Sequence, residues 1–146
     1  MDLDDAQRQG PGRASGPHAT CVVVDDHPAV LGTVGDLLEQ SGFSVVGRAR
    51  TAAEGTEKIE RRAPTVAVVD VQLPDGSGIE LARALRSTAP QTNVILYTGC
   101  GHESLVSEAL EAGARGIVLK GAPLADLVRA IETVASGGTY FDPALS

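Results

Sequence analysis

The sequence predicts an α/β protein of the doubly wound (βα)5 type, a three-layer sandwich in which helices cover both faces of a parallel sheet. One observation is the alternation of short β-branched runs with longer segments of helical periodicity. The second is the presence of continuous apolar runs, at residues 22–24 and 66–69, which are typical of strands buried on both faces. A strand-helix alternation of this kind indicates a parallel sheet with right-handed crossovers.

The expected elements follow one another along the chain. Five runs rich in β-branched residues are expected as strands, at 20–25, 43–48, 65–70, 93–98 and 115–120. Five segments with amphipathic spacing are expected as helices, at 28–40, 52–62, 77–87, 103–111 and 123–135. Asp26 can serve as the N-cap of the first helix, and Gly42 and Gly113 stand where left-handed caps end the first and fourth helices.

At 146 residues the chain is long enough for one domain with tails and too short for two. Residues 1–19 are rich in small and polar residues, so we expect a disordered leader there. We expect the domain at 20–136 and an exit linker at 137–146.

The overall charge and hydropathy exclude several classes of function. A formal net charge of -7 disfavours direct binding to a nucleic-acid backbone. No apolar run approaches the roughly 18 residues of a membrane span, and the N-terminus lacks the apolar centre of a signal peptide, so we expect a cytoplasmic protein. Cys21 and Cys100 should lie at opposite ends of their strands, too far apart for a disulfide, and are expected as free thiols.

The first, third, fourth and fifth predicted strands end in residues that can carry chemistry. In a doubly wound sheet the carboxyl ends of the strands form the functional crevice, so these side chains should meet there: Asp25 with Asp26, Asp70, Thr98 and Lys120. Three carboxylates in one crevice repel one another, and a hard divalent cation compensates that repulsion. The sequence therefore predicts a Mg²⁺ site, to which Gln72 could add its backbone carbonyl.

The same crevice carries donors for a phosphoryl group. Lys120 contributes a positive charge and Thr98 a hydroxyl, both suited to phosphoryl oxygens. Asp70, at the end of the central strand, is the candidate nucleophile, and the product of its attack on phosphorus would be an aspartyl phosphate.

Five motifs in order and at matching spacing resemble the response regulator receiver family, over residues 20–136. They are Val22–Asp26 with His27-Pro28, Val66–Asp70, the loop from Asp70 to Gly78 with Pro74, Thr98-Gly99, and Gly113–Lys120. The resemblance implies the flavodoxin-like, CheY-like fold, with the parallel sheet order 2-1-3-4-5. The residues at 27–28, 113–116 and 135–143 further resemble the NarL/FixJ (LuxR-type) subfamily, whose receivers are usually followed by a helix-turn-helix domain.

The resemblance also implies a function and a role for each site residue. Asp70 would be the phosphoacceptor for a sensor histidine kinase, Asp25 and Asp26 would complete the Mg²⁺ pocket, and Thr98, Gly99 and Lys120 would bind the phosphoryl group and switch. The chain would be a signalling phosphoacceptor and not a conventional enzyme. On phosphorylation it would form a homodimer through a helical face. It would control an output, such as transcription, by reaching DNA through a separate output domain.

One position departs from the family pattern. Receivers commonly carry an aromatic residue three positions before the lysine, and here that position is Ile117. Because of this departure, a pseudo-receiver, which would dock proteins without being phosphorylated, stays an alternative. A stand-alone receiver is another alternative. An aspartyl-nucleophile phosphatase is a further alternative, although such enzymes commonly place the nucleophile on the first strand in an Asp-x-Asp pattern. Read alone, Asp25 and Asp26 could also be mere helix caps.

Overall fold

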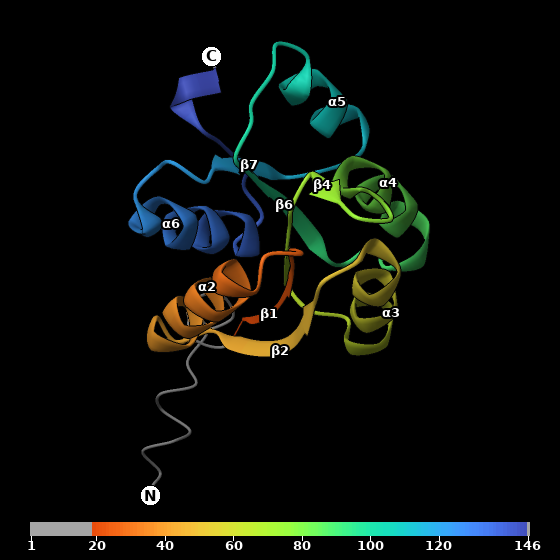
Figure 1. The fold of residues 1–146 in the computed structure, drawn as a ribbon, viewed down its shortest axis with the longest axis vertical. Helices are drawn as coiled ribbons and strands as arrows, with labels where there is room; N and C mark the ends of the chain where they lie inside the picture. Colours follow the sequence, from red (N-terminus) through yellow and green to blue (C-terminus); the bar gives the residue numbers. More distant parts are fainter. Residues whose placement is uncertain (1–18, 146) are drawn as a thin grey trace, which may run out of the picture.

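The computed structural model describes residues 19–145 and forms one parallel sheet with helices on both faces (Figure 1). The sheet has six strands in the order β2-β1-β3-β6-β7-β8. Their bounds are β1 (Thr20–Val24), β2 (Ser44–Ala49), β3 (Val66–Val69), β6 (Asn93–Thr98), β7 (Gly116–Leu119) and β8 (Tyr140–Phe141). The first five strands reproduce the predicted order 2-1-3-4-5, and the predicted fold class is confirmed.

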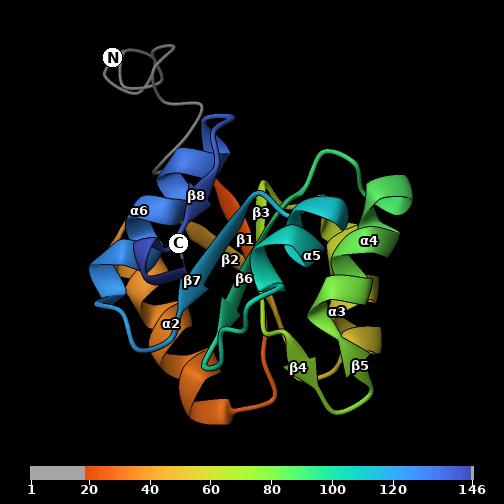
Figure 2. The ribbon, with the colours of Figure 1, turned by 90° about the horizontal axis from the view of Figure 1, so that it is seen from above.

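Two helices cover one face of the sheet and three cover the other (Figure 2). The first group is α2 (Pro28–Gln40) and α6 (Leu124–Ala135), and the second is α3 (Ala52–Arg62), α4 (Gly78–Thr88) and α5 (Leu105–Glu111). The helices begin within two residues of the expected positions. No helix among residues 19–145 is long and apolar enough to span a membrane.

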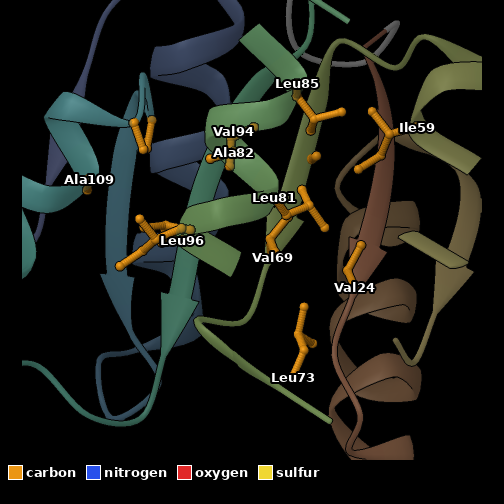
Figure 3. Close-up of a cluster of buried hydrophobic side chains, with 14 of the residues drawn as sticks. Val24, Ile59, Val69, Leu73, Leu81, Ala82, Leu85, Val94, Leu96 and Ala109 are labelled. Carbon is orange, nitrogen blue, oxygen red and sulfur yellow. The ribbon is translucent and has the colours of Figure 1, made fainter. Parts of the chain in front are cut away.

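The apolar runs of the strands divide between two core layers because successive side chains of a strand point to opposite faces. Val22 and Val24 pack beneath α3, α4 and α5, whereas Val23 packs beneath α2 and α6. Figure 3 shows the first layer, where Val69 and Leu96 of the sheet face Leu81 of α4. With both faces covered in this way, only the ends of the strands remain open for a polar site.

The expected helix caps are partly correct. Gly42 and Gly113 have φ of 97° and 88°, the left-handed conformation that was predicted at these positions. The prediction that Asp26 is the N-cap of the first helix is wrong, because α2 begins after His27, which makes no side-chain capping bond. The neighbouring carboxylate of Asp25 accepts a hydrogen bond from the His27 N–H at 3.0 Å, so it is Asp25 that shapes this turn.

A small antiparallel hairpin follows Asp70 and was not predicted. It consists of β4 (Gln72–Leu73) and β5 (Gly76–Ser77). The carboxylate of Asp75, in the hairpin turn, accepts hydrogen bonds from the backbone N–H groups of Ala52 (2.7 Å) and Ala53 (3.0 Å), at the start of α3. These bonds give an acceptor to backbone N–H groups that have none within α3, and they hold the pKa of Asp75 below its ordinary value.

The two ends of the chain compare differently with the predicted leader and linker. Residues 1–18 of the expected leader and Ser146 lie outside the described residues, and Ala19 is buried beside β2 with its carbonyl accepting from the Ser44 N–H. Residues 140–145, expected within a linker, form β8 and the short 3-10 helix η3 (Pro143–Leu145). They pack against β7 as part of the folded unit.

Candidate functional site

The predicted site residues come together at the carboxyl ends of the parallel strands. Asp25 follows β1, Asp70 follows β3, Thr98 ends β6 and Lys120 follows β7. Asp70, Thr98 and Lys120 line an open cleft of about 350 Å³. Its other lining residues are His27, Val30, Gln72, Gly99 and Cys100. The topological argument from the sequence therefore placed the crevice correctly.

A single ammonium group bridges two buried carboxylates. Lys120 Nζ lies 2.7 Å from Asp25 Oδ2 and 3.1 Å from Asp70 Oδ2. Asp25 and Asp70 are only 1% and 5% exposed, so water does little to screen them. The two carboxylates share one cation, which leaves the pair with excess negative charge.

The pKa values of Asp25 and Lys120 follow from burial and from these contacts. Burial alone would raise the pKa of Asp25, but hydrogen bonds from Lys120 and His27 outweigh it and hold that pKa below its ordinary value. Burial alone would lower the pKa of Lys120, but the carboxylates of Asp25 and Asp70 outweigh it and raise that pKa. Asp25 is therefore an anion and Lys120 a cation at neutral pH.

Asp26 and His27 complete the acidic end of the cleft. The Nδ1 atom of His27 lies 2.9 Å from Asp25 Oδ1 and 3.2 Å from Asp26 Oδ1, although the ring is 64% exposed. In the sequence, His27 stands out only through the His27-Pro28 motif. Its contacts with two carboxylates depend on a turn that no spacing rule shows.

The acidic residues form a donor set that fits Mg²⁺. One ligand atom each from Asp25, Asp26, His27 and Asp70 lies within 4.8 Å of the others, the one such group found among residues 19–145. Three of the four are carboxylate oxygens, which a hard cation prefers. Gln72 lies beside them, and its backbone N–H donates to Asp70 Oδ1 at 3.3 Å, while the use of its carbonyl as a ligand stays a prediction.

Thr98 and Gly99 form the opposite wall of the cleft. The hydroxyl of Thr98 accepts a hydrogen bond from the Cys100 N–H at 3.3 Å and donates one to the Cys100 carbonyl at 3.4 Å. Both bonds are long, so the hydroxyl is weakly held by its own loop. Tyr97, the preceding residue of β6, packs on the opposite face of the sheet, in the layer beneath α2 and α6.

Ile117, the position that departs from the family pattern, is fully buried within β7. It packs in the core layer beneath α3, α4 and α5. Phe141 of β8 pairs with it in register and packs against the same layer. An aromatic side chain is thus present beside position 117, supplied by the neighbouring strand.

Sequence reasoning missed a contribution from a distant loop. The Arg50 side chain, after β2, donates to the backbone carbonyl of Asp26 at 3.2 Å and so reaches the acidic end of the site.

The two cysteines lie in different surroundings. Cys100 lines the cleft and is exposed. Cys21 is buried in the sheet, and burial raises its pKa to about 12. Both cysteines are free thiols, as predicted.

Comparison with known proteins gives consistent matches. The family model for the response regulator receiver domain matches residues 21–132. The chain is 36% identical over 126 residues to the response regulator GacA of Pseudomonas viridiflava, covering 86% of this chain and 59% of that protein. It is 38% identical over 121 residues to the DNA-binding transcriptional activator DevR/DosR of Mycobacterium tuberculosis, covering 82% and 56%. The chain thus spans less than two thirds of the length of these relatives.

Among solved structures, the chain is similar to a LuxR-family two-component response regulator from Aurantimonas sp. SI85-9A1. The TM-score is 0.83 at 33% sequence identity, covering 87% of this chain and 91% of that one.

Proposed function

Because this chain belongs to the response regulator receiver family, a family of phosphoacceptor signalling modules, we propose that it accepts a phosphoryl group on Asp70. The donor is the phosphohistidine of a sensor histidine kinase. The observation that carries the proposal is the shared contact of Lys120 with Asp70 and Asp25 at the mouth of an open cleft. A cation beside an acceptor carboxylate is what phosphoryl transfer needs, because negative charge accumulates on the transferring group.

Asp70 is a better acceptor than its neighbour Asp25. Both oxygens of Asp25 are occupied at close range, by His27 at 2.9 Å and by Lys120 at 2.7 Å. Asp70 lines the cleft, and its Oδ1 receives only a long bond of 3.3 Å from the Gln72 N–H. The Oδ1 atom of Asp70 is therefore free to attack the phosphorus atom of the donor, and the oxygens of Asp25 are not.

The step forms a bond between an Asp70 carboxylate oxygen and phosphorus. The bond between phosphorus and the imidazole nitrogen of the donor breaks, and that nitrogen keeps the electron pair and takes a proton from water. Asp25, Asp26, Asp70 and the Gln72 carbonyl would hold Mg²⁺, which neutralises charge on the phosphoryl oxygens when bound. Lys120, Thr98 and the backbone at Gly99 bind those oxygens.

The proposed output is control of transcription. Relatives such as DevR/DosR are transcription regulators, and this chain corresponds to a little over half of their length. We propose that the receiver includes residues 20–136 and the segment at 140–145 that packs against β7, and that it acts on DNA through an output domain. A pseudo-receiver or a stand-alone receiver would have the same fold, and the first experiment below separates a pseudo-receiver from a phosphoacceptor.

Acetyl phosphate with Mg²⁺ is expected to add the mass of one phosphoryl group to the protein, measured by intact mass spectrometry. A chelator added at the start should prevent the gain, because the carboxylates of the site would then repel the donor. Hydroxylamine should remove the group, since it cleaves acyl phosphates. No gain of mass in the presence of Mg²⁺ would contradict the proposal and favour a pseudo-receiver.

Phosphorylation is further expected to drive dimerisation through a helical face. Sedimentation velocity with beryllofluoride and Mg²⁺, which together mimic the phosphoryl group, should show a faster species than the protein alone. A single unchanged species under both conditions would contradict dimerisation while leaving phosphorylation in place.

A further inference from the structure

The C-terminal segment at 140–145, which we call the clasp, docks along the outer edge of β7. The Tyr140 N–H donates to the Arg115 carbonyl at 3.0 Å, and the Asp142 N–H donates to the Ile117 carbonyl at 2.9 Å. A Cβ atom on Gly116 would lie 2.9 Å from the Tyr140 carbonyl oxygen, so the close approach of the two strands depends on this glycine.

Asp142 fastens the clasp near the end of β7. It is only 7% exposed. Its Oδ2 accepts from the Leu119 N–H at 3.1 Å, and its Oδ1 accepts from the Ala144 N–H at 3.0 Å. Leu119 immediately precedes Lys120, so the carboxylate of Asp142 holds the backbone next to the lysine of the cleft.

Leu145 fastens the clasp to the loop that follows Thr98. A Cβ atom on Gly101 would lie 2.8 Å from Leu145 Cδ2, which shows that this side chain rests directly on the loop. Leu145 and Phe141 both pack against the core layer beneath α5. The clasp therefore contacts Leu119, the residue before Lys120, and Gly101, which lies three residues after Thr98.

A phosphoryl group on Asp70 would act on this contact through Thr98. The hydroxyl of Thr98 now donates only a long bond of 3.4 Å to the Cys100 carbonyl. A phosphoryl oxygen is a stronger, charged acceptor and would compete for that hydroxyl proton. Once the bond to Cys100 is lost, residues 99–101 are free to shift, and Leu145 rests on the last of them.

We propose that residues 140–145 are an intramolecular clasp whose docking on β7 and on the loop at 99–101 is weakened by phosphorylation of Asp70. The proposal rests on the proposed function. The occupant of the docking surface is the chain's own segment, which would connect the receiver to any following domain. Undocking would release residues 140–145 from the sheet and expose the edge of β7.

Thermodynamic reciprocity allows the coupling to be measured in two ways, as a change in docking of the clasp and as a change in affinity for the mimic. If a phosphoryl mimic weakens the clasp, then weakening the clasp must raise the affinity for the mimic by the same factor. Leu145→Ser removes the contact with Gly101 without altering a residue of the cleft. Leu110→Ser is the matched control, because Leu110 lies on α5, is 53% exposed and belongs to neither core layer.

The experiment follows amide hydrogen exchange in the full chain by NMR, with and without beryllofluoride and Mg²⁺, and titrates the mimic into each variant. We expect the amides of Tyr140, Asp142 and Leu119 to exchange several-fold faster with the mimic bound. We expect Leu145→Ser to bind the mimic several-fold more tightly than the wild type, and Leu110→Ser to bind it equally. Asp142→Asn, which weakens the bond to Leu119, should act in the same direction as Leu145→Ser.

Two negative results are distinguishable. Resonances of Thr98 and Lys120 that respond to the mimic, with unchanged exchange at 140–145 and unchanged affinity in both clasp variants, would overturn the clasp and leave the phosphoacceptor in place. No response at Thr98 or Lys120 in the wild type would overturn the proposed function, and the coupling with it.

Discussion

Asp70→Asn is expected to abolish the mass gain from acetyl phosphate completely, while the protein stays folded. The amide of asparagine has nearly the same shape as the carboxylate, so the hydrogen bond from the Gln72 N–H can persist. It lacks the negative charge and nucleophilicity needed to attack phosphorus. The substitution also removes one of three carboxylates from the donor set, so Mg²⁺ affinity should fall as well.

The matched control is Asp36→Asn, which also removes one carboxylate. Asp36 lies on α2, and its side chain is 72% exposed. We expect this variant to gain the same mass as the wild type. An equal gain in Asp70→Asn would show that another side chain is the acceptor, and peptide mapping of the phosphorylated product would identify it.

Gly78→Ala is expected to destabilise the protein by about 3 kcal/mol, at the upper end of the range for overpacked positions. The new Cβ atom would clash with the backbone carbonyl oxygen of Asp70 and lie 3.0 Å from Val69 Cγ1. A backbone oxygen cannot move aside as a flexible side chain can. The Gly78 N–H also donates to the Val71 carbonyl at 2.8 Å, which fixes the glycine against this segment.

Urea unfolding followed by circular dichroism measures the effect, with Gly32→Ala as the control. Gly32 lies within α2, and a Cβ atom added there meets nothing within 4 Å. Alanine at an open helical position should stabilise the protein by about 0.5–1 kcal/mol. A loss below about 1 kcal/mol for Gly78→Ala would mean that the loop after Asp70 yields, and that the glycine is not required for packing.

The five-stranded core was predictable because its signals are local and redundant. Val22–Val24 and Val66–Val69 are apolar on both faces, and this pattern alone requires helices above and below the sheet. The hairpin at 72–77 was not predictable, since two strands of two residues each carry no periodicity. The cap that Asp75 provides to α3 was also missed, because it joins residues more than 20 positions apart.

The site was predictable in its membership and not in its contacts. The ends of parallel strands must meet, which places Asp70 and Lys120 together whatever the side-chain details. Nothing in the spacing shows that Lys120 lies closer to Asp25 than to Asp70, or that His27 bonds to Asp25. Those contacts depend on turn geometry after β1, and the mistaken assignment of Asp26 as N-cap has the same origin.

The position of β8 also bears on how the protein avoids self-association through its sheet. Without that strand, β7 would present four apolar or small residues, Gly-Ile-Val-Leu, along an open edge. Such an edge is a template for pairing with strands of other molecules. The edge that β8 itself presents is two residues long and is followed by Pro143, which has no backbone donor. A fragment that ends before Tyr140 would therefore carry an aggregation hazard absent from the longer chain.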